Sequence, residues 1–566
     1  MNVRPPSMKI SHISSALLIS FAIGQLGALP SLAQTIPDAG VLQQQQQQLE
    51  QERERTFPTE VPPDATPSPQ QPTESAVTVL VKTFQFSGNT QYTDEQLQTV
   101  VAPYVNQHLN LAALRKATAA VSEYYREAGW VVRAYLPKQD ITDGTVTINI
   151  QEATFGGAVL SGEPPTHVAI EDISDLLNTQ LTSQQRLNTK SLDRGLLLAD
   201  DLPGVSVTGA LQAGEREGET SVHYTATDDP RLHGELGINN GGNRGTGMAQ
   251  GYATAYINSP FKLGDQLTAS TIISSGSEYG RLRYTTPIGH DGWRVGGSAS
   301  LLSYRLIAPE FSALNGKGHA STVGLEAFYP LIRARTYNLQ GLLNYDYRQF
   351  ENRALSTRQS DYHINEGTIG LTGNWFETLT GLHGANFGSL TWILGTLDQG
   401  KHQAAENSNR EGFFTKFRLY ISRQQELLSW LSLQGTFTGQ KAFETLDSAE
   451  KFYLGGPNSI RAYPVNEASG SSGVATNLEL RAQLPHGFDI TGFYDVGRVY
   501  NKRNAGGNST LKGGGLSVAW ASWFGLSLDV TWSHRLGDNP NPIATGKDQD
   551  GSQILDRFWL SAIYSF

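Results

Sequence analysis

The 566-residue sequence predicts a membrane all-β fold: a 16-stranded antiparallel outer-membrane β-barrel preceded by two small α/β domains. Three observations support this prediction. From about residue 231 onward, segments of about ten residues alternate between apolar and polar side chains, as strands do between lipid and a polar lumen. Upstream, residues 77–228 contain the same order of strands and helices twice. The chain ends on a phenylalanine, a residue typical of this barrel class.

Residues 1–33 have the features of a secretory signal peptide. Arg4 and Lys9 give a positive start, residues 16–29 are mostly apolar, and residues 31–33 form a small-x-small cleavage site. A membrane-anchoring helix is the alternative, but polar and glycine residues interrupt an already short apolar run. Because no later segment has the 18 or so apolar residues of a spanning helix, strands would have to cross the membrane.

Two unusual segments follow the signal peptide. Residues 34–56 contain the glutamine run 43–48 and then LEQERER, which favours an N-terminal helix, although its low complexity is also compatible with disorder. Residues 57–76 contain six prolines and predict an extended linker, which at about 3.1 Å per residue would reach roughly 60 Å. A helix on this tether can lie far from its sequence neighbours.

Residues 77–153 and 154–228 each predict a strand, two helices and two further strands. The first unit has strand 77–86, a capping box at Thr93 and Gln96, helix 111–128 ended by Gly129, and strands 130–136 and 145–150. The second has strand 154–160, helices 171–179 and 191–200, and strands 205–211 and 221–227. Exposed sheet edges in such units can accept an extended peptide by strand addition, although two folded spacers would show the same pattern.

Residues 229–566 contain the alternating segments. The predicted strands are 231–239, 246–259, 264–275, 278–287, 293–306, 318–330, 337–350, 361–376, 387–398, 411–422, 429–440, 474–484, 488–500, 510–520, 525–535 and 553–566. Their even number fits a bacterial single-chain barrel, whereas a soluble β-sandwich would have shorter strands. In the last strand Tyr564 and Phe566 share an apolar face, which resembles the C-terminal assembly signal of such barrels.

The connection 440–473 is predicted to lie on the extracellular side, between strands eleven and twelve. Its segment 454–464, LGGPNSIRAYP, has no helical or strand period and therefore predicts a loop. In strand 488–500, a period of two places Asp495 on the lumen side. A carboxylate there needs water or a cation, and Arg461 can reach it if the loop folds inward. A surface loop with Arg461 in water is the alternative.

Composition excludes several classes of function. The net charge of −10 argues against a nucleic-acid partner, and the absence of cysteine excludes disulfides and thiolate sites. The 12 histidines are scattered, and there is no HExxH, GxSxG or P-loop motif. The sequence thus predicts no enzyme, no catalytic or metal-binding residues and no cofactor.

Almost the whole chain resembles the outer-membrane translocators of two-partner secretion, of the haemolysin-activator and filamentous-haemagglutinin transporter type. GGPNSIRAYP is similar to the arginine-tyrosine loop motif of that family, and FYDVG to its Phe-x-Asp-x-Gly motif. The resemblance implies two periplasmic POTRA (polypeptide-transport-associated) domains and a loop that reaches into the lumen, where Arg461 meets Asp495. The implied site residues are Gly455, Gly456, Ser459, Ile460, Arg461, Ala462, Tyr463 and Pro464 on the loop, and Phe493, Asp495 and Gly497 on the wall. Ala462 stands where many relatives have glycine, so the backbone there must avoid positive φ.

The resemblance also implies a function: export of a large unfolded passenger, an adhesin- or haemolysin-like β-helical protein, to the cell surface without nucleotide hydrolysis. The POTRA domains would bind the passenger in the periplasm, and its folding outside would give the transport its direction. Residues 34–56 would form the plug helix of the resting pore. Outer-membrane lipid and the barrel-assembly machinery, which would recognise Tyr564 and Phe566, are further expected partners.

Three other functions fit parts of the sequence. A barrel-assembly factor of the same superfamily would insert other barrels, but it usually carries more than two POTRA domains. A passive porin would lack periplasmic domains, and an outer-membrane enzyme would need a catalytic set.

Overall fold

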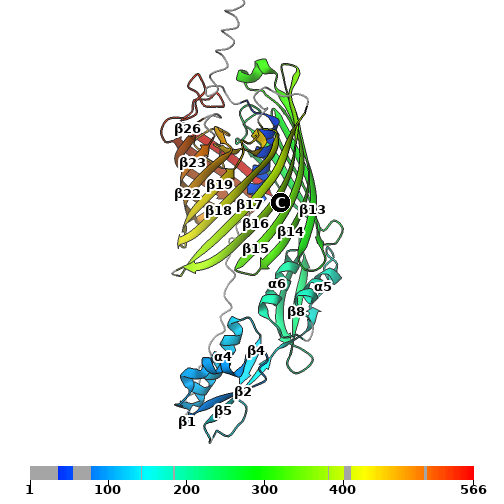
Figure 1. Cartoon of the computed structure of the whole chain (residues 1–566), viewed down its shortest axis with the longest axis vertical. Coiled ribbons are helices and arrows are strands. Elements are labelled where there is room, and N and C mark those ends of the chain that lie inside the picture. The colour runs from blue at the N-terminus through cyan, green and yellow to red at the C-terminus, as the bar shows by residue number, and fades with distance from the viewer. Residues whose placement is uncertain are drawn as a thin grey trace, which may run out of the picture.

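The computed structural model describes residues 36–54, 78–141, 143–182, 185–379, 381–400, 410–501 and 507–566. A closed barrel stands above two small α/β domains, which follow one another away from it (Figure 1). The predicted signal peptide, 1–33, and linker, 57–76, lie outside the described residues. None of the helices in these ranges is long and apolar enough to cross a membrane.

The barrel has sixteen strands in sequence order, as predicted, and it closes where the last strand pairs with the first. The strands are β9 (Leu232–Asn239), β10 (Gln250–Asn258), β11 (Gln266–Ser274), β12 (Ser277–Ile288), β13 (Trp293–Arg305), β14 (Lys317–Arg333), β15 (Tyr337–Ala354), β16 (Thr357–Leu379), β17 (Leu382–Gln399), β18 (Gly412–Leu428), β19 (Leu431–Ala442), β22 (Ser472–Leu484), β23 (Phe488–Tyr500), β24 (Ser509–Ala521), β25 (Leu526–Arg535) and β26 (Asp556–Ser565). Two short 3-10 helices, η3 (Pro309–Leu314) and η6 (Pro485–Gly487), lie in the connections between strands.

Strands β14 to β18 are longer than the segments that the sequence predicted. β16 has 23 residues, about twice the number that a tilted strand needs to cross a bilayer. The reason is that antiparallel pairing continues beyond the membrane, where the outer face no longer has to be apolar. Without an apolar face, these strand ends show little alternation in the sequence.

The first α/β domain contains the predicted elements and one additional pair of strands. Its elements are β1 (Thr78–Val81), β2 (Thr83–Ser87), α3 (Asp94–Val101), η2 (Ala102–Tyr104), β3 (Gln107–Asn110), α4 (Leu111–Glu127), β4 (Val132–Tyr135) and β5 (Thr145–Glu152). Thr93 and Gln96 form the predicted capping box, and Gly129 follows α4 with a φ of +93°. The single strand predicted at 77–86 is divided into β1 and β2, and β1 pairs with β3, a strand too short to predict.

The second α/β domain repeats the order of the first. It consists of β6 (Thr154–Leu160), α5 (Ile170–Gln180), α6 (Thr189–Asp200), β7 (Val205–Ala213) and β8 (Glu219–Asp228). Its sheet order is β6-β8-β7, which matches the β2-β5-β4 order of the first domain. In each sheet the first strand pairs parallel with the central one and the last strand pairs antiparallel with it. The repeat in the sequence is therefore a repeat in topology.

Glu152 lies at the junction of the two domains. Its carboxylate accepts hydrogen bonds from the backbone of Thr90 and Gln91 and from Tyr125, and it pairs with Arg186 of the second domain at 3.0 Å. Burial alone would raise the pKa of Glu152, but the hydrogen bonds from Thr90, Gln91 and Tyr125 outweigh burial and hold it below its usual range. The ionised carboxylate thus ties the two domains together.

The second domain also contacts the periplasmic end of the barrel. Arg333, at the end of β14, makes a bidentate contact with Asp201 at 2.8 Å, and Arg335 pairs with Asp193 at 2.8 Å. Arg194 of α6 donates to the carbonyl of Pro330 at 2.8 Å. Charged contacts thus fix this domain beside the mouth of the pore.

The N-terminal segment forms a helix inside the barrel. It is α2 (Ala39–Glu54), drawn in dark blue within the ring of strands in Figure 1. It contacts β13, β14 and β15, and its glutamines Gln43 to Gln46 are buried.

Candidate functional site: the loop and helix in the lumen

Loop 440–473 folds into the barrel as a small structure of its own. It consists of the 3-10 turn η5 (Ser448–Glu450) and the hairpin β20 (Phe452–Leu454) with β21 (Ala468–Gly470). Leu454, Ile460, Ala462 and Tyr463 are buried and pack against Ala475, Val499 and Leu511 of the inner wall. The loop therefore occupies the lumen, and the alternative of a loop in open solvent is wrong.

Arg461 is at the centre of the contacts between loop and wall. Its guanidinium makes a bidentate contact with Asp495, with Nη2–Oδ1 at 2.7 Å and Nε–Oδ2 at 2.9 Å, and its backbone N–H donates to the same carboxylate. A third bond runs from Nη1 to Glu479 at 2.9 Å. Since Asp495 is fully buried, Arg461 is the cation that neutralises it.

The other two positions of the FYDVG motif also contact the loop. Because side chains alternate along β23, Phe493, Asp495 and Gly497 all face the lumen. The Arg461 guanidinium lies 3.5 Å from the centroid of the Phe493 ring, a cation–π contact. A Cβ atom at Gly497 would lie 2.7 Å from Leu454 and 3.0 Å from Ile460, so only glycine leaves room for the loop there.

Glycine and small residues shape the loop itself. Gly455 and Gly456 have φ values of +103° and +97°, and a Cβ at Gly455 would lie 2.1 Å from the carbonyl oxygen of Pro464. Ala462 has no positive φ, as its side chain requires, and it fits against Gly513 of β24. Ser459 contributes its carbonyl, which accepts a bond from Asn477 at 2.8 Å.

Four residues that contact Arg461 or its partner Asp495 were not predicted as site residues. Asn477 and Glu479 lie on β22, directly opposite Asp495 and Phe493 in the register with β23. Ser533 and Trp559 donate to the carbonyl of Arg461 at 2.7 and 2.8 Å. For Asn477 and Glu479 the sequence did contain a signal, because both lie on the polar face predicted for strand 474–484. The same period of two places Ser533 and Trp559 on the lumen side of their predicted strands, but no motif distinguishes them there.

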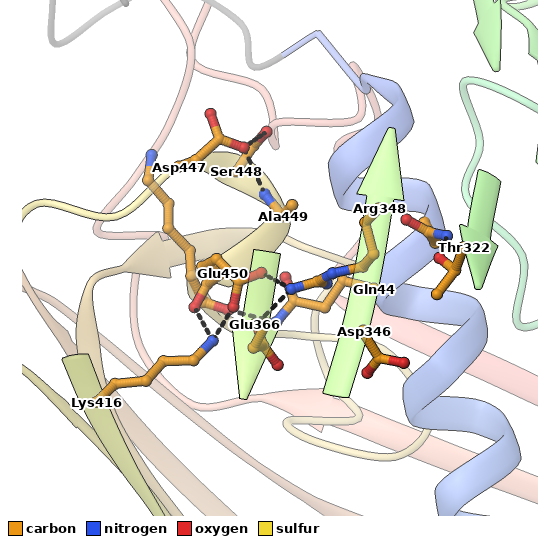
Figure 2. A network of polar contacts seen from close by, with 12 residues as sticks. Gln44, Thr322, Asp346, Arg348, Glu366, Lys416, Asp447, Ser448, Ala449 and Glu450 are labelled. Carbon is orange, nitrogen blue, oxygen red and sulfur yellow. Dashed lines mark hydrogen bonds and ion pairs between the residues drawn. The ribbon is translucent and has the colours of Figure 1, made fainter. Parts of the chain in front are cut away.

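A second cluster holds the beginning of the loop on a different part of the wall. Figure 2 shows Glu450 of η5 between Arg348 of β15 and Lys416 of β18, and it pairs with both. Arg348 also pairs with Glu366 of β16. Gln440 donates to the carbonyl of Glu450 at 2.9 Å. No sequence signal predicted this cluster, since η5 carries no motif.

The end of the loop has a third anchor. Glu467 is buried and accepts hydrogen bonds from Asn539 at 2.6 Å and from the backbone of Gln549 at 2.9 Å. Both donors lie in the connection between β25 and β26, on the extracellular side. The loop is thus held at its beginning, middle and end by different strands.

The helix α2 lies beside this loop and has polar contacts along its length. Near its N-terminus Ala39 donates to Asn352 at 2.9 Å, and Gln44 donates to the carbonyl of Lys451, just after η5, at 2.6 Å. Near its C-terminus Glu50 pairs with Arg281 at 3.0 Å, and Arg53 stacks on Tyr252 at 3.4 Å. Hydrogen bonds and ion pairs hold α2 in the lumen, together with the apolar packing of Ala39 and Leu42 against the wall.

Tyr564 lies on the outer face of β26, and Phe566 directly follows the end of that strand. Both rings are partly exposed and stack with a centroid distance of 6.4 Å. The backbone of Phe566 pairs with that of Gly234, where the barrel closes. Their role as an assembly signal stays a prediction.

Comparison with known proteins identifies the family. Residues 218–520 match the family described as haemolysin secretion/activation protein ShlB/FhaC/HecB, and residues 79–153 match the POTRA domain of ShlB type. The chain belongs to this family. It is an outer-membrane translocator of two-partner secretion, with POTRA domains in the periplasm.

Individual relatives cover almost the whole length. The chain is 26% identical over 603 residues to the heme/hemopexin transporter protein HuxB of Haemophilus influenzae (strain 86-028NP), covering all of both chains. It is 24% identical to the outer membrane transporter CdiB of Escherichia coli, covering 79% of this chain and 77% of the relative. The solved structure of CdiB from Escherichia coli has the same fold, with a TM-score of 0.71, 21% identity and coverage of 95% of this chain and 100% of that one. These matches favour the translocator over the barrel-assembly alternative.

Proposed function

We propose that the barrel lumen is the route of the secreted passenger, and that α2 and loop 440–473 together close it at rest. The observation that carries this proposal is the position of α2, which lies along the inner wall with polar contacts at both ends. The amide oxygens of Gln43 to Gln46 are buried without a protein partner in the part of the chain that the structure describes. The polar contacts hold the helix in the lumen, but burial of unpaired amide oxygens weakens its binding, so the helix can leave.

Removal of residues 34–56 tests this closure. The shortened protein should form channels of higher single-channel conductance in planar bilayers than the full chain. A matched control replaces the six glutamines 43–48 with serine, which keeps the length of the segment but weakens the helix and its contacts. That variant should open intermittently. If deletion leaves the conductance unchanged, α2 does not close the pore.

The POTRA domains capture the passenger by strand addition. In the first domain β4 is an edge strand, and a groove of about 700 Å³ runs between it and α4. Leu111, Trp130, Val132 and Tyr135 make the groove largely apolar, and Arg115 and Arg126 stand along it. An extended passenger segment with apolar side chains would pair with β4 and place them in this groove.

A bulky substitution in the groove tests this capture. Ala119 lines the groove and is exposed, so Ala119→Trp fills the groove without changing the domain core. Lys116→Trp is the control, because Lys116 is exposed on the same helix but does not line the groove. Ala119→Trp should reduce binding of the passenger's N-terminal region, and Lys116→Trp should not. Equal effects of the two would exclude the groove.

The outer face of the barrel provides the remaining contacts. Residues such as Leu301, Leu325 and Ile238 are more than half exposed on this face, where outer-membrane lipid would cover them. The barrel-assembly machinery recognises Tyr564 and Phe566 at the closing strand. Transport of this kind needs no covalent step and no nucleotide, and the passenger's folding outside the cell gives it direction.

A further inference from the structure

The turn at residues 447–450, which contains η5, is the place where loop, wall and plug helix meet. Glu450 is almost completely buried, with 2% of its surface exposed, and its carboxylate pairs with both Arg348 and Lys416. Its carbonyl accepts bonds from Lys416 Nζ at 3.1 Å and Gln440 Nε2 at 2.9 Å. Four contacts from three strands therefore hold this one residue of the loop.

Charge balance explains why Glu450 has to be present when the lumen is closed. Arg348 and Lys416 are both buried cations of the wall, and Glu366 is the buried anion on the wall that pairs with Arg348. Asp346 lies beside Arg348 as well, and Glu450 supplies the carboxylate that contacts Lys416. If the turn left, a buried cation would lose its partner, and an unpaired buried charge is strongly unfavourable.

The same turn is also the support of α2. A Cβ atom on Gly40, in the first turn of α2, would lie 2.9 Å from the backbone nitrogen of Ala449 and 3.0 Å from its Cβ. The helix backbone thus approaches η5 as closely as glycine permits. Gln44 adds its bond to Lys451, and Asp447 accepts a bond from Tyr362 of the wall at 2.9 Å. Figure 2 shows the helix beside this turn.

We propose that Glu450 is a positioning residue that couples the plug helix to the loop. Its turn binds the wall through Glu450 and α2 through Ala449, so each element stabilises the inward position of the other. This inference rests on the proposed closing role of α2 and the loop. Because such coupling is reciprocal, loosening either element must loosen the other by the same factor.

Two single-cysteine variants report separately on the helix and on the loop. No other thiol reacts with the reagent, because the chain has no cysteine. Leu42 on α2 is 1% exposed and Leu454 on the loop is 0% exposed. The variant Leu42→Cys reacts with a maleimide only when the helix leaves, and Leu454→Cys only when the loop leaves. The rate of alkylation by a maleimide-polyethylene glycol, in protein reconstituted into liposomes, measures each release separately.

Glu50→Gln is the decisive perturbation. Glu50 binds Ser270, Tyr279 and Arg281 of β11 and β12, and it lies ten residues along the helix from Gly40, about 15 Å away. This substitution loosens the helix far from the turn. With coupling, the rate at Leu454→Cys rises at least about fivefold, the lower end for coupled sites. A rise at Leu42→Cys with an unchanged rate at Leu454→Cys would overturn the proposal.

Two further variants act at the turn itself. Glu450→Gln removes the charge, and Gly40→Leu separates helix and turn without touching the ion cluster. Both should raise the rate at both reporters. Glu351→Gln on β15, whose partners Arg353 and Arg358 are partly exposed, is the control and should raise neither. Heat-modifiable migration on gels shows that each variant forms a barrel; if Glu450→Gln does not, Gly40→Leu and Glu50→Gln still decide the question.

The outcomes also separate this inference from the proposed function. Coupled alkylation rates together with unchanged conductance after deletion of residues 34–56 would support the coupling and refute the closing role. Increased conductance together with independent reporter rates would support the closing role and refute the coupling.

Discussion

Replacement of Arg461 by alanine should release the loop without unfolding the barrel. Asp495 is fully buried, and the Arg461 side chain is 11% exposed, so this pair is a buried one. A solvent-exposed pair would contribute at most about 1 kcal/mol. Removing one partner of a buried pair costs about 3–5 kcal/mol, because the other charge stays uncompensated. Since 1.4 kcal/mol is a factor of ten, a cost of about 3 kcal/mol shifts the loop equilibrium by roughly two orders of magnitude.

The remaining contacts of Asp495 set the lower limit of this effect. Asn477 donates to Asp495 at 2.8 Å, and the backbone N–H of residue 461 donates at 3.1 Å, so Arg461→Ala removes the charge but not every donor. The strands themselves are held by the continuous ladder between β22 and β23. Secretion of the passenger should therefore fall strongly, while the amount of protein in the outer membrane stays normal.

A double-mutant cycle decides whether the two residues act through one contact. Arg461→Ala and Asp495→Ala should each impair secretion, and the double variant should be little worse than either alone. Arg481→Ala is the control, because Arg481 pairs with Glu479 nearby but is 43% exposed. It should have little effect. Strictly additive losses from the two single variants would refute the reasoning, because they would show that Arg461 and Asp495 act separately.

Three other predictions follow from the same structure. Deletion of residues 77–153 should abolish secretion while the barrel still inserts, as measured by passenger in the medium and by outer-membrane fractionation; normal secretion would contradict the capture role. Gly497→Val should displace the loop sterically, so secretion should fall although no charge changes; a Val that is tolerated would show that Leu454 and Ile460 can move away. The lowered pKa of Glu152 stabilises the POTRA junction above the ordinary carboxyl pKa, and this stabilisation is lost as the pH falls through the lower folded value. The protection factors of the Thr90 and Gln91 amides, which account for the slower intrinsic exchange at lower pH, should therefore fall in acid, and Glu152→Gln should remove that dependence.

The barrel could be predicted because the side chains of a membrane strand alternate between lipid and lumen with a period of two residues. Membrane strands must place apolar side chains outward at every second position. The pattern therefore indicates both where a strand lies and which of its side chains face the lipid. This is why Asp495 could be placed in the lumen and Tyr564 on the outer face. The continuation of β16 beyond the membrane could not be predicted, since that part of the strand has no apolar face to reveal it.

Some contacts of the loop could likewise be predicted from the sequence, and others could not. Arg461 and Asp495 belong to two motifs that resemble those of a family, and period two places Asn477 and Glu479 beside them. Glu450 has no such support, because a 3-10 turn has no strand period and its partners Arg348 and Lys416 are distant in sequence. Contacts across the lumen depend on which strands the closed barrel places near one another. A local sequence pattern does not contain this information.

The glutamine run of α2 shows why the sequence left its structure open. A helix that packs on one apolar surface needs an apolar stripe, and α2 has none that would have predicted its place. In the lumen α2 meets a mixed wall: Ala39 and Leu42 pack in an apolar cluster with wall residues such as Leu302. Gln43 and Gln44 instead donate hydrogen bonds, to Thr322 and to the carbonyl of Lys451. The glutamine side chains are also soluble outside the barrel. A helix with a continuous apolar stripe would pack more firmly on this apolar cluster and would leave the lumen less readily. The composition that looked like disorder is thus what a removable closure requires, and a segment 43–48 rebuilt with leucine should block secretion even with both anchors of α2 intact.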